Sequence, residues 1–422
     1  MKISIIGCGY VGTVTGVCFA DFGHDIAFYD VDKKKLDLLA RGESPIYEPL
    51  LDDLIQKNPE RLTTTLDLSA AVRNTDITFI CVGTPSRDDG SINLTYVLSA
   101  ATMIGEALRE TLDFHPVIVK STVFPGSTEG PICSALEEAS GRKAFVDFGL
   151  GSNPEFLREG NAIYDFREPD RIVLGAKDAR TMRALGALYA PFTCPKIETS
   201  IQTAEMIKYA SNAFLATKIS FANEIGNLAK KLGIDSEEVF SGVGLDSRIG
   251  PAFFRTGIGF GGSCFPKDVR ALIAGAGDHD EDLQILHAAL RVNEGQPLKM
   301  IRLLQAHIPD LRGRRIGVLG LAFKPNTDDI RESRAIPIIQ ALLDAGARVI
   351  AYDPLAMGDF SKIFPEIEYA SSARTVLAAD AVLITTEWEE FECIDYSGVT
   401  VIDGRRIAAA SRTADIYEGI CW

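Results

Sequence analysis

The N-terminal stretch constrains the fold of this chain more than any other feature. The apolar run 2–6 predicts a buried parallel strand, and the segment G-C-G-Y-V-G follows it at once. A helix is expected over 14–22 and a second strand over 25–29, which ends at Asp30. This order of strand, glycines, helix, strand and acid predicts a doubly wound parallel sheet with a dinucleotide site.

Three glycines, Gly7, Gly9 and Gly12, have the spacing of a dinucleotide-binding turn. We expect Gly7 to make the tight turn, Gly9 to let the backbone reach a pyrophosphate, and Gly12 to let helix and strand pack. Asp30 is placed to accept hydrogen bonds from ribose hydroxyls, and its carboxylate repels a 2′-phosphate, so NAD is favoured over NADP. A plain helix-capping loop is the alternative, and the flanking strands and Asp30 argue against it.

Two further predicted strands end in threonine-containing turns. Strands are expected over 76–82 and 116–120, and the segments G-T-P and S-T-V-F-P-G follow them. Thr84 and Thr122 therefore lie beyond strand ends, where doubly wound sheets bind ligands. Ordinary turn chemistry is an equally good explanation of either threonine alone.

A pair of acids follows a strand expected over 145–149. Glu155 and Glu159, in N-P-E-F-L-R-E-G, lie four residues apart around a predicted short helical turn and could point at one place. A carboxylate beside an active site can act as a base toward water. A solvated acidic turn is the alternative.

One long helix is predicted over 204–232, because apolar residues recur at helical spacing with few breakers. It is long enough to cross between domains. Lys208 and Asn212 share one of its faces. A lysine there could steady an oxyanion, and an asparagine could hold a hydroxyl or a water. A solvent-facing pair is the alternative.

The most glycine-dense segment, G-I-G-F-G-G-S-C-F-P-K-D, contains a single cysteine, Cys264. The glycines let the backbone approach a ligand closely. A helix is predicted over 266–276, since proline suits a first helical position. Cys264 would then precede a helix N-terminus with Lys267 nearby, and both favour the nucleophilic thiolate. A small buried cysteine in a loop turn is the alternative.

A second α/β unit follows a helical region over 291–314. Its expected elements are the strands 315–319, 348–352, 381–385 and 399–402 and the helix 336–345. This sheet lacks the G-x-G-x-x-G spacing. Lys324, Arg331 and Arg334 crowd its first loop, a basic cluster that suits a phosphate ligand.

The composition argues against several classes of protein. The 422 residues predict two or three domains, and the net charge of −15 argues against a nucleic-acid or anionic-membrane partner. The chain starts with a strand and has no apolar run of membrane length, so we expect no signal peptide, no membrane segment and a cytoplasmic location. The eight cysteines and five histidines are scattered, which predicts free thiols and no metal site.

Seven motifs in order resemble those of the UDP-glucose/GDP-mannose dehydrogenase family, over nearly the whole chain. They are G-C-G-Y-V-G, C-V-G-T-P, S-T-V-F-P-G, N-P-E-F-L-R-E-G, the helix with Lys208 and Asn212, G-F-G-G-S-C-F-P-K-D and G-L-A-F-K-P-N-T-D-D-I-R-E-S-R. The resemblance implies an α/β chain of two Rossmann-like doubly wound domains joined by a long central helix and helical region. The expected boundaries are 1–198 for the NAD-binding domain, 199–295 for the central domain with the cysteine loop, and 296–422 for the UDP-sugar-binding domain.

The resemblance also implies an NAD-dependent, four-electron oxidation of a primary alcohol to a carboxylate. Cys264 would attack the aldehyde from the first oxidation, the thiohemiacetal would be oxidised to a thioester, and water assisted by Glu155 would hydrolyse it. Lys208 would stabilise the oxyanion, and Asn212 and Asp268 would orient water and substrate groups. The implied catalytic positions are Cys264, Lys208, Asn212, Asp268, Glu155 and Thr122.

The family's binding positions transfer by motif to this chain. Those for NAD fall on Gly7, Gly9, Tyr10, Val11, Gly12, Asp30, Lys35, Thr84, Thr122, Glu159, Lys267 and Arg331. Those for the substrate fall on Glu155, Phe156, Leu157, Arg158, Lys208, Asn212, Arg248, Phe253, Gly261, Phe323 and Lys324. Arg248 matches an arginine that reaches the neighbouring subunit's substrate, and the long central helix favours a homodimer.

The motif N-P-E-F-L-R-E-G followed by P-D-R-I-V-L-G looks like the UDP-glucose group of the family. The expected reaction is therefore UDP-glucose to UDP-glucuronate with two NADH per turnover. UDP-N-acetylmannosamine and GDP-mannose are alternative substrates. A catalytically silent NAD-sensing protein would lack the Cys, Lys or Glu of these motifs, and a two-electron hydroxyacid dehydrogenase would leave Cys264 unexplained.

Overall fold

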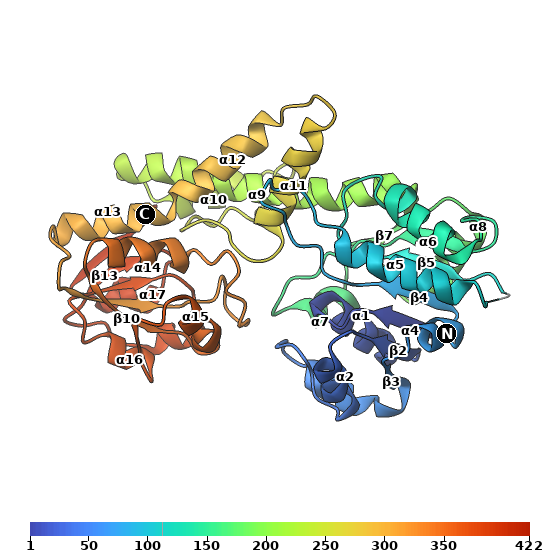
Figure 1. Cartoon of the computed structure of the whole chain (residues 1–422). Helices are drawn as coiled ribbons and strands as arrows, with labels where there is room; N and C mark the ends of the chain where they lie inside the picture. The colour runs from blue at the N-terminus through green and yellow to red at the C-terminus, as the bar shows by residue number, and fades with distance from the viewer. Residues whose placement is uncertain (112) are drawn as a thin grey trace. The chain divides into compact units, whose positions relative to one another are not determined.

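The computed structural model describes residues 1–111 and 113–422, which form two compact units, Met1–Ser211 and Asn212–Trp422. Each unit contains one α/β sheet (Figure 1). The long helix α9 (Ile201–Lys231) begins in the first unit and ends in the second. The predicted fold class, two α/β sheets joined by a long helix, is confirmed. The three predicted domain boundaries stay a prediction.

The first sheet has eight strands in the order β3-β2-β1-β4-β5-β6-β7-β8. All neighbours are parallel except β6 and β7. The chain order reverses between β1 and β4, which makes this the point where doubly wound sheets bind ligands. The strands are β1 (Lys2–Ile6), β2 (Asp25–Tyr29), β3 (Leu62–Thr65), β4 (Ile77–Ile80), β5 (Pro116–Val119), β6 (Gly149–Ser152), β7 (Ile172–Ala176) and β8 (Lys196–Thr199).

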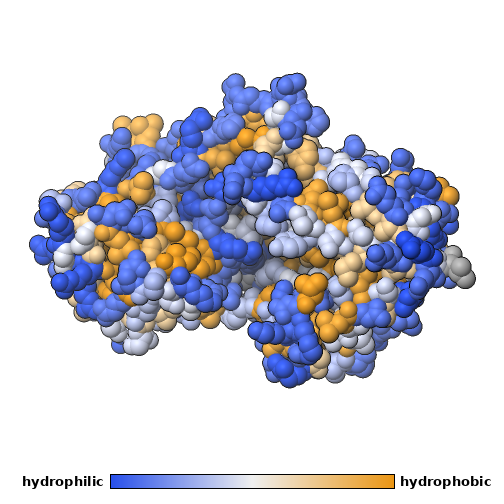
Figure 2. All heavy atoms as spheres, viewed as in Figure 1, coloured by the Kyte–Doolittle hydropathy of each residue, from blue (hydrophilic) through white to orange (hydrophobic). Residues whose placement is uncertain are grey.

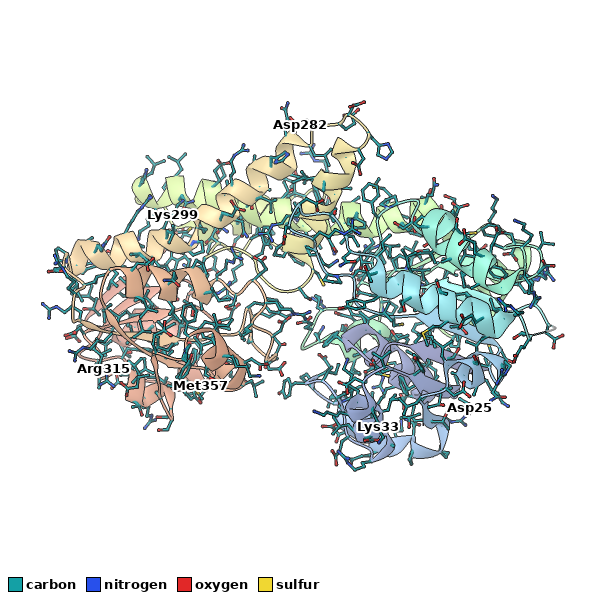
Figure 3. All side chains as sticks on the ribbon, viewed as in Figure 1. Asp25, Lys33, Asp282, Lys299, Arg315 and Met357 are labelled. Carbon is teal, nitrogen blue, oxygen red and sulfur yellow. The ribbon has the colours of Figure 1, made fainter. Side chains whose placement is uncertain are left out.

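Helices connect these strands, as parallel neighbours require. The helices are α1 (Tyr10–Asp21), α2 (Lys33–Ala40), α3 (Leu51–Lys57), α4 (Leu68–Arg73), α5 (Thr95–Leu108), α6 (Cys133–Ser140), α7 (Ala162–Arg167) and α8 (Ala179–Leu188). Asp25 and Lys33, labelled in Figure 3, mark the starts of β2 and α2 on either side of Asp30.

The second sheet is entirely parallel and has the order β11-β10-β9-β12-β13-β14, which repeats the winding of the first. Its strands are β9 (Arg315–Leu319), β10 (Arg348–Tyr352), β11 (Glu368–Tyr369), β12 (Ala381–Ile384), β13 (Thr400–Asp403) and β14 (Ile416–Gly419). The helices of this unit after α9 are α10 (Ser236–Gly244), α11 (Phe265–Gly277), α12 (Gln284–Gly295), α13 (Pro297–His307), α14 (Ala335–Asp344), α15 (Met357–Ile363), α16 (Ala373–Val376) and α17 (Ala408–Thr413).

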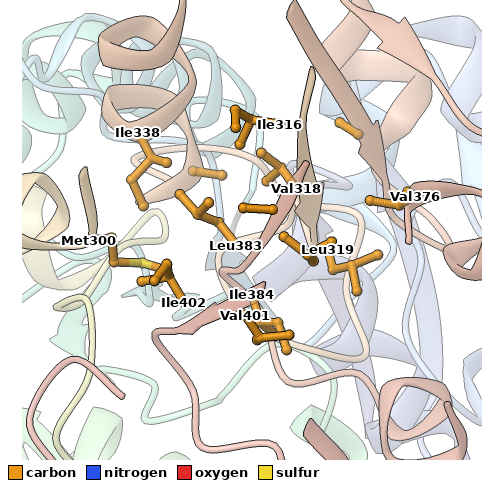
Figure 4. Packing of buried hydrophobic residues seen from close by; sticks show 14 of the residues in the cluster. Met300, Ile316, Val318, Leu319, Ile338, Val376, Leu383, Ile384, Val401 and Ile402 are labelled. Atoms are coloured by element: carbon orange, nitrogen blue, oxygen red, sulfur yellow. The ribbon is translucent and has the colours of Figure 1, made fainter. Parts of the chain in front are cut away.

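Aliphatic side chains fill the core on both faces of each sheet, because parallel strands are covered by helices on both sides. In the second unit, Val318 and Leu383 from the central strands and Ile338 from α14 are fully buried (Figure 4). Hydrophilic residues cover much of the face drawn in Figure 2, with patches of apolar residues among them. Within the described residues, no helix combines the length and the apolar character needed to cross a membrane.

One predicted strand is wrong. Residues 145–147 form a turn: Phe145 has a φ of 66°, which a strand does not allow, and its N–H donates to the carbonyl of Phe148 at 2.8 Å. The strand begins only at Gly149, which pairs with Pro116 of β5. The apolar residues of this segment therefore close a turn before the strand that leads to Glu155.

Candidate active site

The glycine turn after β1 requires glycine at two places because of the protein's own packing. Gly7 has a φ of 101°, and a β-carbon on Gly12 would lie 1.9 Å from the Gly7 carbonyl oxygen. Gly9 is different, since a β-carbon there would meet no protein atom within 4 Å. Its open side faces the space at the N-terminus of α1, where phosphate groups bind in such turns.

A cavity of about 380 Å³ lies at the ends of β1, β2 and β4, next to this turn. Asp30 lines it, and its carboxylate accepts hydrogen bonds from the N–H groups of Cys8 (2.7 Å) and Asp32 (2.8 Å). Lys35 lies 3.7 Å from the same carboxylate. An acid fixed at the end of β2 beside an open glycine and a cavity of this size fits the adenosine half of a dinucleotide. The remaining lining residues are Ile6, Gly7, Gly9, Tyr29, Val31, Cys81, Val82, Gly83, Tyr96, Ser99, Ala100 and Met103.

The two predicted threonines lie together at neighbouring strand ends. The Thr84 hydroxyl donates to the carbonyl of Thr122 at 2.9 Å. Further along this loop, the buried carboxylate of Glu205 in α9 accepts from the N–H groups of Gly126 (2.7 Å) and Thr128 (3.1 Å). Helix α9 therefore anchors the segment that carries Thr122.

Glu155 forms a buried ion pair with Lys208 of α9. The Lys208 Nζ and the Glu155 Oε1 are 2.9 Å apart, and the two side chains are only 4% and 6% exposed. Burial alone would raise the pKa of Glu155, but the Lys208 ammonium and the N–H of Leu157 hold that pKa below its usual value. The carboxylate is therefore ionised at neutral pH and ready to accept a proton.

The loop that carries Glu155 differs from the predicted helical turn. Residues 153–158 have no helical structure, so the four-residue spacing of Glu155 and Glu159 does not put them on one helical face. The loop is held from both ends instead. Glu48 accepts from the N–H groups of Gly160 (2.6 Å) and Ala162 (2.7 Å) and from the Tyr10 hydroxyl.

The beginning of this loop is fixed by Asn153. Its Oδ1 accepts from the Lys120 ammonium at 2.9 Å and from the Tyr189 hydroxyl at 2.5 Å. Sequence reasoning missed Lys120, Asn153 and Glu48 as site residues. The N-P-E tripeptide and a lysine at the end of a predicted strand were the available signals, but only the folded chain shows that they meet.

The aromatic residue after Glu155 lies under two cations. The Arg171 guanidinium is 4.0 Å from the centre of the Phe156 ring, and the Lys208 Nζ is 5.4 Å from it. Arg158 instead binds Asp165 on α7 at 2.6 Å and is half exposed. The predicted substrate residues of this loop therefore divide into the half-buried Phe156 and Leu157 and the exposed Arg158.

In the second unit, Cys264 is the N-cap residue of α11, and its Sγ lies 3.5 Å from the Ser263 hydroxyl. The predicted helix over 266–276 is α11 and starts one residue earlier. Asp268, 1% exposed, bonds Lys267 through one carboxylate oxygen (2.5 Å) and the Asn212 amide through the other (2.7 Å). This carboxylate fixes the side chain of Asn212, which follows Lys208 by about one turn of α9.

Two glycines before Cys264 are required by the protein's own packing. A β-carbon on Gly261 would lie 2.3 Å from the Glu332 carbonyl, and one on Gly262, whose φ is 82°, would lie 2.7 Å from the Phe323 ring. The Gly262 N–H also donates to the Arg331 carbonyl at 2.9 Å. The cysteine loop is therefore held directly against the loop that follows β9.

The predicted basic cluster in that loop is largely neutralised by its own acids. Arg331 binds Asp329 at 2.7 Å, and the buried Arg334 binds Glu332 at 2.9 Å. The Lys324 Nζ lies 5.4 Å from the centre of the Phe323 ring. A phosphate ligand of this cluster therefore stays a prediction, and it would have to compete with these acids for Arg331 and Arg334.

Two other predicted substrate residues lie in the segment between α10 and the cysteine loop. Arg248 is 86% exposed at its side chain and binds Asp246 at 2.6 Å. Phe253 has a φ of 67°, and its ring contacts that of Phe265 at a centroid distance of 6.0 Å. In the part of the chain that the structure describes, no three His, Cys, Asp or Glu side chains form a group that could hold a metal ion.

Comparison with known proteins gives matches along the chain. Models of the UDP-glucose/GDP-mannose dehydrogenase family match residues 1–193 (NAD binding domain), 202–295 (central domain) and 317–410 (UDP binding domain). The chain is 49% identical to a UDP-glucose 6-dehydrogenase of Haloferax volcanii, with 100% of both chains covered. It is 39% identical to a GDP-mannose 6-dehydrogenase of Pseudomonas putida, again over 100% of both.

Solved structures give a similar ranking. A UDP-glucose dehydrogenase from Pyrobaculum islandicum is 47% identical with a TM-score of 0.96, over 100% of this chain and 98% of that one. A UDP-D-ManNAc dehydrogenase from Pyrococcus horikoshii is 28% identical with a TM-score of 0.87, over 100% and 99%.

Proposed function

The chain belongs to the UDP-glucose/GDP-mannose dehydrogenase family, and from this premise we infer that it is an NAD-dependent UDP-glucose 6-dehydrogenase. The observation that carries the choice of substrate is the full-length identity of 49% to a relative of that name, against 39% for one named for GDP-mannose. The chemistry requires, besides the cofactor, a nucleophile, an oxyanion partner and a base for water. Cys264, Lys208 and Glu155 supply these types of group.

Residues 1–193 match an NAD binding domain, and NAD, when bound, accepts the hydride in each of the two oxidations. The open face of Gly9 admits the pyrophosphate, and Asp30, with Lys35 beside it, accepts from the adenosine ribose. The other proposed contacts come from Gly7, Tyr10, Val11, Gly12, Thr84, Thr122, Glu159, Lys267 and Arg331. Tyr10 contributes through its backbone, because its hydroxyl is already bonded to Glu48.

Cys264 makes the intermediate that separates the two oxidations. Its position at the N-terminus of α11 stabilises negative charge on sulfur, and the thiolate adds to the aldehyde carbon to form a thiohemiacetal. Loss of a second hydride from that carbon gives the thioester. The covalent bond also keeps the aldehyde from leaving between the two steps.

Lys208 and Glu155 act in successive steps of the reaction at the same substrate carbon. The Lys208 ammonium stabilises the alkoxide oxygen, and Asn212, oriented by Asp268, holds the substrate hydroxyl or the water. The ionised Glu155 accepts a proton from the water that attacks the thioester, and the Cys264 thiolate leaves. The reaction consumes one water and two NAD for each alcohol converted to a carboxylate. Thr122 lies in the segment that α9 anchors and completes the proposed catalytic set.

The proposed contacts of the nucleotide sugar come from several segments of the chain. The loop after Glu155 supplies Phe156, Leu157 and Arg158, and the residues 317–410 match a UDP binding domain. In the loop after β9, Lys324 is proposed as a cation for the diphosphate. The other proposed contacts are Arg248, Phe253, Gly261 and Phe323.

We also propose that the chain forms a homodimer through the C-terminal part of α9. Phe214, Phe221 and Leu228 are 65%, 50% and 54% exposed and recur every seven residues, so they form one apolar stripe. A second copy of the helix would cover it. Wild-type protein should have twice the mass of one chain in light scattering, and Phe214→Glu with Phe221→Glu should halve it. A wild-type mass of one chain contradicts this proposal.

The substrate is tested by NADH formation with UDP-glucose, UDP-N-acetylmannosamine and GDP-mannose in parallel. UDP-glucose should give the highest kcat/KM by at least about tenfold, which corresponds to about 1.4 kcal/mol of transition-state binding. Glu155→Gln should release NADH in a burst and then stall, because the thioester accumulates. A preference for either other nucleotide sugar overturns the substrate, and an unchanged steady rate in Glu155→Gln overturns the role of Glu155.

A further inference from the structure

Two lysines are buried near Glu155, and the proposed mechanism uses one of them. Lys208 is the ion-pair partner. Lys120, at the end of β5, is 4% exposed, and its Nζ donates to Asn153 Oδ1 at 2.9 Å and lies 3.4 Å from the Asn153 carbonyl. A buried ammonium costs several kcal/mol unless the site compensates its charge. The position of Lys120 therefore needs an explanation beyond packing.

The hydrogen bonds of Asn153 show what Lys120 holds in place. Oδ1 accepts from Lys120 and from Tyr189, and Nδ2 donates to the Val173 carbonyl at 2.9 Å. The Asn153 N–H donates to the Val119 carbonyl at 2.9 Å. Pro154 follows with a fixed φ, and Glu155 comes next. The backbone that carries Glu155 is thus positioned by Asn153, whose Oδ1 and Nδ2 both form hydrogen bonds.

The charges around this point favour an ionised Glu155. The groups that face Lys120 are Cys81 from the end of β4, Glu155 from the loop and Lys208 from α9. Burial lowers the pKa of Lys120 to about 8, with the thiol and Glu155 acting in the opposite direction. Burial also raises the pKa of Cys81 to about 12, so its thiol is neutral and Glu155 is the anion that faces both ammonium groups.

A small cavity touches the same groups. Its volume is about 50 Å³, and its walls include Lys120, Asn153, Glu155 and Tyr189. Two further charged groups, Asp165 and Arg171, also line it. The cavity has room for a water molecule and several polar partners for it.

We propose that Lys120 is a positioning residue for the hydrolytic step: through Asn153 and its own charge it keeps Glu155 in place and ionised when Lys208 turns to the substrate oxyanion. The inference rests on the proposed function, in which Lys208 serves the oxyanion and Glu155 serves the water. While the Lys208 ammonium interacts with the substrate oxyanion, its electrostatic stabilisation of the Glu155 carboxylate weakens. A second ammonium that never contacts the substrate compensates for that loss.

The test compares Lys120→Gln and Lys120→Met with Tyr189→Phe. Lys120 and Tyr189 donate to the same Asn153 oxygen, but only the lysine variants remove a charge, and Lys120→Gln keeps a donor. Two quantities are measured for each variant. One is the acidic limb of the pH profile of kcat with UDP-glucose and NAD, and the other is the pH titration of the carboxyl infrared band that disappears in Glu155→Gln.

Both Lys120 variants should move the acidic limb and the carboxyl titration upward by about one pH unit, the size of effect expected for loss of a nearby opposite charge. Tyr189→Phe should leave both unchanged even where it lowers the melting temperature. Titrations that stay in place in the Lys120 variants, or that move as far in Tyr189→Phe, reduce Lys120 to a packing residue. If Lys120→Met does not fold, Lys120→Gln decides. If wild type makes no NADH from UDP-glucose, the proposed function fails, and the infrared titration still decides the role of Lys120.

Discussion

Alanine at Gly9 should weaken cofactor binding, whereas alanine at Gly12, in the same turn, should lower the stability of the fold. The two glycines lie three residues apart, yet the spaces around their missing side chains are opposite. A β-carbon on Gly12 would lie 1.9 Å from the Gly7 carbonyl oxygen and 3.1 Å from the Cys81 β-carbon, and one on Gly9 would meet nothing within 4 Å. Gly9 also has a φ of −79° and a ψ of −167°, which alanine adopts without strain.

The magnitudes follow from these distances. Real β-carbons essentially never come within 3.0 Å of another heavy atom, so Gly12→Ala must separate α1 from the turn by about 1.1 Å. Overpacking of this kind costs about 1–3 kcal/mol, and more where backbone must move. Gly9→Ala should change the free energy of unfolding by less than about 0.5 kcal/mol, as for an open position. It should weaken NAD binding at least about tenfold, because its methyl group occupies the approach to the pyrophosphate.

Urea unfolding gives the free energy of unfolding of both variants, and calorimetric titration gives their NAD affinity. Binding of UDP-glucose to Gly9→Ala serves as the control for an intact second site. The reasoning is refuted if Gly9→Ala binds NAD as tightly as wild type, or if it is destabilised as much as Gly12→Ala. Either result would mean that the open face of Gly9 is not where the cofactor approaches.

Two further predictions concern stability. Burial lowers the pKa of His115 from 6.5 to about 4. As pH falls through this window, the unfolded chain binds a proton that the folded chain does not, so the free energy of unfolding falls by about 3 kcal/mol in all. The urea midpoint should therefore fall less steeply between pH 7 and pH 4 in His115→Gln than in wild type. Leu50 is 62% exposed with a φ of 68°, so Leu50→Gly should raise the free energy of unfolding by up to about 1 kcal/mol. The same change at Leu66, also exposed but without positive φ, should lower it, and equal effects at both positions would contradict the role of backbone strain.

Much of the fold could be predicted because its signals are local. The strands 2–6, 25–29, 315–319 and 348–352 match the structure residue for residue, since each is a short apolar run bounded by glycine, proline or charge. The error at 145–149 has a physical cause. A short, mostly apolar segment also fits a turn that precedes a strand, and periodicity cannot separate the two.

The contacts of the site could be predicted less well, because long-range pairs decide them. The Lys208–Glu155 pair joins residues 53 positions apart, and no local pattern specifies whether a lysine on a helix meets an acid or the solvent. The basic residues of the loop after β9 are a second example. Their acids, Asp329 and Glu332, stand in the same motif, but the sequence does not tell which charges neutralise each other.

The second sheet also shows why similar winding does not give a similar site. Asp353 follows β10 as Asp30 follows β2, but it is fully buried and accepts from the N–H groups of Leu321 and Ala356 and from the Trp388 indole. Arg315 and Met357, labelled in Figure 3, mark the starts of β9 and α15 around it. A carboxylate used in this way stabilises the loop and has no capacity left for a ribose.

The central claim is that Cys264 carries the substrate through a four-electron oxidation, and the most direct measurement is the NADH formed per UDP-glucose consumed at completion. Wild type should form about two NADH, one for each hydride removed. Cys264→Ser should show little turnover, since the serine hydroxyl is a weaker nucleophile than a thiolate and its alkoxide is a poorer leaving group. One NADH per UDP-glucose, unaffected by Cys264→Ser, would contradict the thioester mechanism and favour a two-electron dehydrogenase.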